Sequence, residues 1–186
     1  MQSPIAENKN QNIAMRLAYI ALFAATLTGG KFALSFLPNI EIVTILILAY
    51  ASVFGFWYVF PATMVFCTTE ILLYGFGTWV IAYFIYWNLL GIFAAILLKK
   101  QVMWKALVYA VCCTVFFGVL TTAMDVLWVS LGQQNASIFL KLFVSKYILG
   151  LTFYALHLAS AVVTVLVLYK PLCKMLNKIK AKTICD

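Results

Sequence analysis

Charge is nearly absent from the middle of this chain. Between Lys31 and Lys99 there is no Lys or Arg, and only Glu41 and Glu70 carry a charge. As one continuous helix this stretch would measure about 100 Å, at about 1.5 Å per residue. Because the hydrocarbon core of a bilayer is only about 30 Å thick, the stretch must cross a membrane, turn and cross again. The sequence therefore predicts an all-α, polytopic membrane protein.

The basic residues are gathered where membrane topology requires them. The chain is 66% hydrophobic and 10% charged, with a net charge of +8, whereas soluble domains are about 25% charged. Ten of the 13 basic residues are expected on the cytoplasmic side by the positive-inside rule: Lys9, Arg16, Lys99, Lys100, Lys105, Lys170, Lys174, Lys178, Lys180 and Lys182. Lys31, Lys141 and Lys146 would lie outside or just within the membrane. Anionic headgroups, rather than nucleic acid, are the ordinary partner of such a tail.

Apolar runs and Gly/Pro breaks predict a bundle of six transmembrane helices. The expected spans are residues 13–37, 42–54, 57–74, 78–98, 104–131 and 138–169, the last closed by Pro171. Six crossings place the termini and the Lys99–Lys100 loop in the cytoplasm, whereas five or seven would not. The spans form one domain, 13–169, between a polar N-terminal tail, 1–12, and a basic cytoplasmic tail, 170–186. The second span is short, so it tilts, merges with its neighbours or is buried by protein.

Other signals are mostly absent. The polar start and the long apolar run after it do not resemble a cleavable signal peptide. The five cysteines have no zinc or CxxC spacing, so neither a metal site nor a disulfide framework is expected. No HExxH, GxSxG or phosphate-binding loop occurs. We therefore expect no catalytic residues and no cofactor, and any ATP hydrolysis must occur in other subunits.

Small residues form one face of the first predicted helix. Ala14, Ala18, Ala21 and Ala25 recur at spacings of four, three and four, which brings them to one side. Such a smooth face lets another helix approach closely. That helix belongs either to this bundle or to a separate partner protein.

Three charged residues fall in the outer halves of the predicted spans: Glu70, Asp125 and Lys146. Charges at this depth are costly and usually face a cavity or one another. An Asp125–Lys146 or Glu70–Lys146 ion pair and a ligand-binding role are both compatible with the pattern.

Aromatic side chains gather at the same depth. Trp79, Tyr83 and Tyr86 share one face of the fourth predicted helix. Belts of Trp and Tyr at the membrane interface account for Trp79 and Trp128, but less well for the deeper Tyr83, Tyr86 and Tyr154. The mixed faces of the last three helices predict an outward-opening pocket for an amphipathic small molecule. The single histidine, His157, either bonds to a neighbouring helix or contacts this ligand.

Two passages resemble a known family. The stretch Leu37-Pro38-Asn39-Ile40-Glu41-Ile42-Val43-Thr44 is similar to a passage of the substrate-binding S components of energy-coupling factor (ECF) transporters. The length, the six predicted helices and the alanine face resemble the same family. The segment from Tyr74 to Trp87 looks most like the S components assigned to cobalamin, while pantothenate, riboflavin and queuosine-precursor types remain open.

The resemblance implies a role and a set of residues. An S component in the prokaryotic plasma membrane binds a vitamin or related micronutrient from outside and docks on a transmembrane T component coupled to two cytoplasmic ATPases. The resemblance assigns docking to Ala14, Ala18, Ala21 and Ala25. It assigns ligand binding to Asn39, Glu41, Trp79, Tyr83, Tyr86, Asp125, Trp128, Lys146, Tyr147 and Tyr154.

Two other classes of function fit the same residues. An autonomous secondary transporter could use Glu70, Asp125 or His157 for proton coupling, although the two halves show no internal repeat. A structural membrane protein would use the aromatics as belts and the charges as ion pairs.

Overall fold

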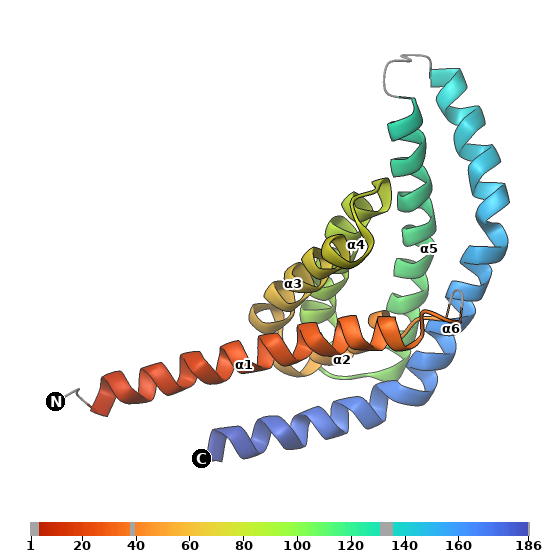
Figure 1. Ribbon diagram of the computed structural model, residues 1–186. Coiled ribbons are helices and arrows are strands. Elements are labelled where there is room, and N and C mark those ends of the chain that lie inside the picture. Colours follow the sequence, from red (N-terminus) through yellow and green to blue (C-terminus); the bar gives the residue numbers. More distant parts are fainter. Residues whose placement is uncertain (1–3, 38–39, 131–135, 186) are drawn as a thin grey trace.

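The computed structural model describes residues 4–37, 40–130 and 136–185. These residues form six α-helices, and five of them are long and apolar enough to cross a membrane, as in an all-α membrane bundle. The helices are α1 (Pro4–Ala33), α2 (Val43–Phe54), α3 (Phe56–Tyr74), α4 (Thr78–Leu97), α5 (Met103–Val129) and α6 (Ala136–Cys185). Figure 1 shows α2 in the centre, α3 and α4 side by side, and α5 beside the first half of α6.

The short second helix is enclosed by protein. All twelve residues of α2 are buried, and α2 contacts α1, α3, α4 and α6. An apolar helix of about 18 Å, at about 1.5 Å per residue, would be too short to span a bilayer alone. Of the three alternatives that the sequence left open, burial by protein is the one the structure adopts.

Side-chain contacts between helices give the direction of each helix. Arg16 donates to the Trp57 carbonyl (3.1 Å) and Thr28 bonds to Thr69 (3.0 Å), so α1 and α3 run in the same direction. Glu41 bonds to Ser160, and Ser52 to Tyr169, so α2 and α6 also run in the same direction.

The remaining pairs run in opposite directions. The α3–α4 contacts are Thr63 with Asn88 (2.7 Å) and Val59 with Gly91. The α4–α5 contacts are Leu90 with Tyr109 (2.9 Å) and Tyr83 with Phe117, and the α5–α6 contacts are Thr122 with Tyr154 (2.8 Å) and Asp125 with Lys146. In each pair the residue numbers rise along one helix as they fall along the other. The six helices therefore alternate in direction. This alternation agrees with the predicted topology, in which the N-terminal tail, the Lys99–Lys100 loop and the C-terminal tail lie on one side of the membrane.

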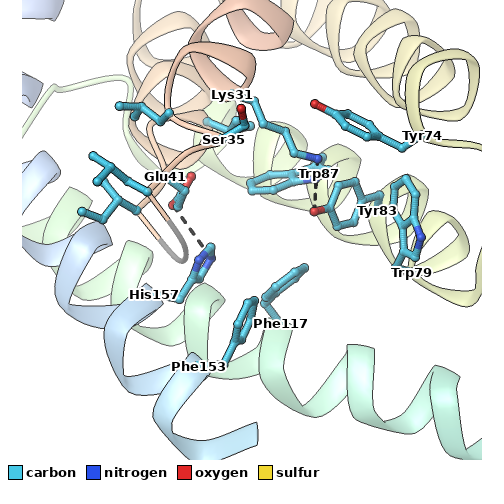
Figure 2. A pocket seen from close by; sticks show the side chains of 14 residues that line it. Lys31, Ser35, Glu41, Tyr74, Trp79, Tyr83, Trp87, Phe117, Phe153 and His157 are labelled. Carbon is cyan, nitrogen blue, oxygen red and sulfur yellow. Dashed lines mark hydrogen bonds and ion pairs between the residues drawn. The ribbon is translucent and has the colours of Figure 1, made fainter.

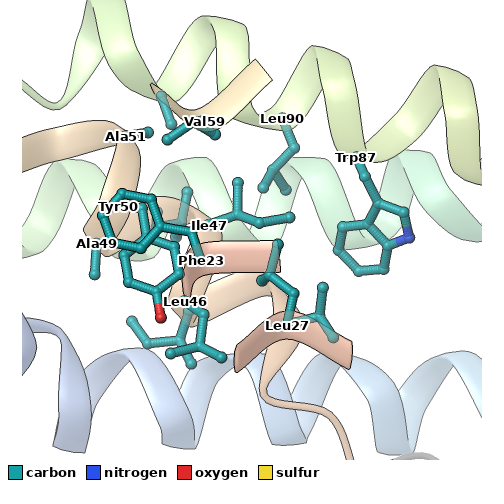
Figure 3. Packing of buried hydrophobic residues seen from close by; sticks show 14 of the residues in the cluster. Phe23, Leu27, Leu46, Ile47, Ala49, Tyr50, Ala51, Val59, Trp87 and Leu90 are labelled. Carbon is teal, nitrogen blue, oxygen red and sulfur yellow. The ribbon is translucent and has the colours of Figure 1, made fainter. Parts of the chain in front are cut away.

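The core lies where α1, α3 and α4 surround α2 (Figure 3). Phe23 of α1 stacks on Tyr50 of α2 with ring centroids 4.0 Å apart, and the Tyr50 hydroxyl bonds to Thr26 (2.6 Å). Gly91 of α4 lies so close to α3 that an added Cβ would be 2.7 Å from Val59. Bonds and small residues of this kind hold helices together in membranes, where the hydrophobic effect between them is weak.

Two helices extend beyond their expected ends. α1 begins at Pro4 rather than near residue 13, since Pro suits the first helical position and no Gly or Pro follows it before Ile13. α6 continues through Pro171 to Cys185, so it does not close there as expected. It curves over its second half (Figure 1), and a proline that removes one backbone hydrogen bond bends a helix without ending it.

Candidate functional site

A cavity of about 460 Å³ lies beside the connection between α1 and α2. Its walls come from the ends of α1 and α3, the start of α2, and α4, α5 and α6 (Figure 2). The lining residues are mostly apolar or aromatic: Lys31, Leu34, Ser35, Leu37, Ile40, Glu41, Val43, Tyr74, Trp79, Tyr83, Trp87, Phe117, Phe153 and His157. A cavity of this size and character is typical of small-molecule sites.

One wall of the cavity holds a caged cation. The Lys31 ammonium forms an ion pair with Glu70, whose side chain is only 1% exposed. The same nitrogen lies 3.4 Å from the Tyr83 hydroxyl and 4.6–6.0 Å from the ring centres of Tyr83, Tyr74, Trp79 and Phe66. Aromatic faces attract cations at such distances. The charge of Lys31 is therefore compensated within the protein, which leaves this wall without a net charge for a ligand.

The opposite wall is polar and incompletely bonded. Glu41 precedes α2, and its Oε2 accepts the Thr44 amide (2.9 Å) at the start of that helix. The Glu41 backbone exchanges hydrogen bonds with Ser160 of α6 (3.0 and 3.3 Å). The remaining oxygen, Oε1, is buried and has no hydrogen-bond partner. The Glu41 carboxylate is thus held in place with one acceptor free.

His157 faces this acceptor from α6. Its Nε2 lies 3.9 Å from Glu41 Oε1 and is likewise buried without a hydrogen-bond partner. The imidazole packs between Phe117 and Phe153, with ring centres 5.2 and 6.1 Å away. Glu41 and His157 therefore face one another as a long ion pair when the imidazole is protonated, and neither of the two atoms has a hydrogen bond.

Protein atoms enclose both of these atoms, so a polar atom can bridge them only when the two side chains move apart. A group about 2.8 Å from each would satisfy both within ordinary hydrogen-bond distances. A hydroxyl suits this position because it can donate to the carboxylate while accepting from an imidazole N–H. The cavity can hold an apolar or aromatic body, and a hydroxyl group of such a ligand could reach Glu41 and His157, which both line it.

The structure brings only some of the predicted ligand-binding residues to this cavity. Glu41, Trp79 and Tyr83 line it, while Asn39 lies outside the described residues. Tyr86 is buried in the core against Trp87 and Phe117, with ring centres 4.7 and 4.8 Å away, and does not line the cavity.

The other predicted residues lie along α5 and α6, away from the cavity lining. Asp125 accepts a bond from Thr78 of α4 and lies 3.8 Å from Lys146, which is the ion pair considered from the sequence. The Tyr154 ring stacks on Tyr147 (5.3 Å) and occupies the space that Cβ atoms on Gly118 and Gly150 would need. Trp128 is exposed. These residues join α5 to α6 and to α4.

Sequence reasoning did not place several lining residues in the site. Lys31 was expected outside or just within the membrane, and Tyr74, Trp87, Phe117 and Phe153 were not singled out as ligand contacts. A signal for Lys31 was present: the first and third spans run the same way, so Lys31 and Glu70 end at the same depth. The contact between Glu41 and His157 had no such signal in the sequence, because it depends on how α2 packs against α6.

The four alanines of α1 all lie on its exposed side. The opposite side of α1 carries Phe23, Ala24 and Leu27, which are buried in the core. Gly29 continues the alanine face toward the cavity end, and open space surrounds it. A partner surface there stays a prediction, but within the described bundle no helix covers these alanines.

Comparisons with protein-family models, with curated proteins and with solved structures found no match to this chain.

Proposed function

We propose that this chain is the substrate-binding subunit of an ATP-driven importer of the ECF type in a prokaryotic plasma membrane. It captures a vitamin or related micronutrient from outside and docks on a transmembrane T component. Two separate ATPase subunits supply the energy, so this chain binds its substrate and catalyses no reaction.

The observation that carries the proposal is an aromatic cavity whose wall holds a charged pair, Glu41 and His157, with no hydrogen bond to Glu41 Oε1 or His157 Nε2. A protein whose aromatics were only membrane belts would have no reason to keep buried polar atoms unbonded there. The cavity also lies at the end of α1 opposite the basic N-terminal flank, as a site open to the outside requires.

The exposed alanine face supports the second half of the proposal. Lipid contacts large and small apolar side chains equally well, so contact with lipid gives no reason for a face made of small residues. Their use is close helix approach. A T component that packs on Ala14, Ala18, Ala21 and Ala25 leaves the cavity end of α1 free for the ligand.

The size of the cavity bears on the substrate. About 460 Å³ suits a drug-sized molecule, so a pantothenate- or riboflavin-sized ligand fits the cavity as it stands. Cobalamin, the best match by resemblance, is larger than this volume. Pantothenate, riboflavin and cobalamin all carry hydroxyl groups that could form hydrogen bonds with Glu41 and His157.

Small molecules that co-purify with the chain test the proposal. We expect mass spectrometry of protein purified without added ligand, from cells grown in rich medium, to detect one vitamin-class compound in near-stoichiometric amount. A preparation that carries no such compound, and that binds none of cobalamin, pantothenate, riboflavin or queuosine precursors by calorimetry, would contradict the proposal.

Substitution of two matched phenylalanines tests whether the ligand binds in the cavity. Phe153 lines the cavity and is 43% exposed, whereas Phe116 is not part of the lining and is 47% exposed. Phe153→Ala should weaken binding of the identified ligand by about 1–3 kcal/mol, as expected for a contact residue. Phe116→Ala should leave affinity unchanged in the same calorimetric measurement. Equal effects of the two changes would place the ligand elsewhere.

A further inference from the structure

A second cavity of about 460 Å³, open to the surface, lies at the opposite side of the molecule, between the α4–α5 connection and the last part of α6. Three lysines line it together with two amide side chains: Lys170, Lys174, Lys178, Gln101 and Asn177. The lysines follow one another at intervals of four residues, so they lie on one face of α6. No carboxylate belongs to its described lining.

The walls of this cavity are held in place by specific contacts. Gln101 and Asn177 exchange two side-chain hydrogen bonds (2.9 and 3.4 Å), which tie the α4–α5 connection to α6. Lys180 donates to the Val53 carbonyl (2.7 Å), and the Tyr169 hydroxyl bonds to Ser52 (2.8 Å). The end of α6 is thus fixed to α2 rather than extending freely as a tail.

Among the described residues, no acidic side chain forms an ion pair with the lining lysines. The ion pairs among the described side chains involve Lys31, Lys146 and His157, and none of them involves Lys170, Lys174 or Lys178. The three lysines are exposed on one face of α6, and their neighbouring ammonium groups repel one another and favour a multivalent anion. Each amide NH₂ of Gln101 and Asn177 has a second hydrogen beyond their mutual bonds, and such donors favour an oxygen-rich anion such as a phosphate.

The position of the cavity favours a lipid as the source of that phosphate. Directly before Lys170 on α6, the side chains of Val163, Leu166 and Val167 are exposed and apolar. A headgroup bound at the lysines would leave its acyl chains against this surface. Basic cavities between helices on the cytoplasmic side are known to hold anionic headgroups.

We propose that this cavity binds the phosphate of an anionic phospholipid headgroup in the cytoplasmic leaflet. The site is separate from the cavity at Glu41 and His157, and it does not depend on the proposed transport function. It gives the basic end of α6 a specific partner rather than a general attraction to the membrane surface.

Native mass spectrometry of the detergent-purified chain tests the proposal, with phosphatidylglycerol and phosphatidylcholine of identical acyl chains as probes. We expect the unmodified chain to retain phosphatidylglycerol in preference to phosphatidylcholine. Lys174→Gln combined with Lys178→Gln should lower retention of phosphatidylglycerol by about tenfold or more. Lys174→Arg combined with Lys178→Arg should preserve it.

The matched control removes the same charge elsewhere. Lys105→Gln combined with Lys141→Gln changes two exposed lysines outside the cavity lining, and it should leave retention unchanged. An equal loss in this control would show a general charge effect and overturn the proposal. So would equal retention of both lipids by the unmodified chain, which requires no variant to fold. Displacement of the lipid by millimolar inorganic phosphate would assign the site to free phosphate instead.

Discussion

Lys31→Ala should lower the free energy of unfolding by about 3–5 kcal/mol, the usual cost of leaving one member of a buried ion pair without its partner. Glu70 is buried beneath the Lys31 side chain, and no other cation of the described chain is recorded in an ion pair with it. The aromatic rings around Lys31 would also lose the side chain that they enclose. Unfolding in detergent micelles, followed by circular dichroism against temperature or denaturant, measures the change.

The chain contains its own control for this effect. The Lys146–Asp125 pair joins α6 to α5 in the same way, but its side chains are 39% and 46% exposed. Lys146→Ala should therefore cost less than about 1 kcal/mol. Combining Lys31→Met with Glu70→Gln should recover most of the loss, because neither residue is then charged. Similar small costs for Lys31→Ala and Lys146→Ala would mean that burial of Glu70 does not determine the stability of this contact.

Ala21→Trp should abolish substrate uptake by the assembled importer while ligand binding by the isolated chain is retained. Ala21 lies in the middle of the exposed alanine face of α1, and an indole there would hold a partner helix several ångströms away. The cavity lies at the far end of α1, so its contacts are unchanged. Radiolabelled vitamin uptake by cells that produce all subunits, together with calorimetry on the purified chain, separates the two effects.

Ala155→Trp is the matched control for this substitution. Ala155 is also exposed, but on α6, where the proposed partner does not bind. The same increase in side-chain size should leave uptake unchanged there. If Ala21→Trp transports normally, the alanine face is not the docking surface. If Ala21→Trp loses ligand binding as well, α1 affects the site directly.

The arrangement of the helices could be predicted because it depends on local signals. Gly55 and Gly75 have φ angles of 82° and 80°, in the left-handed region that glycine adopts easily, and each separates two helices near the expected position. The alternation of directions follows from the positions of the lysine clusters. Pro171 was misleading, because the effect of a proline inside a helix depends on the packing around it, and Tyr169 and Cys173 are both buried against the bundle.

The candidate site was harder to predict, because a stripe of side chains does not reveal which neighbour it faces. Trp79 and Tyr83 were predicted to face a pocket, and both line the cavity. Tyr154 has the same character, yet its ring packs against the positions of Gly118 and Gly150. Two glycines on facing helices could have indicated that an aromatic ring fills the space between them. The pairing of Glu41 with His157 joins residues far apart in sequence, which periodicity cannot detect.

The length and continuity of α1 have a mechanical consequence. Lys31 in the cavity wall and Ala18 on the exposed face belong to one uninterrupted helix, and they lie about 20 Å apart at about 1.5 Å per residue. A helix of this kind moves nearly as a rigid rod. Any rotation of α1 that pulls Lys31 away from Glu70 turns the alanine face through the same angle. Movement of α1 at the cavity would therefore move the alanine face directly, without a chain of side-chain rearrangements through the core.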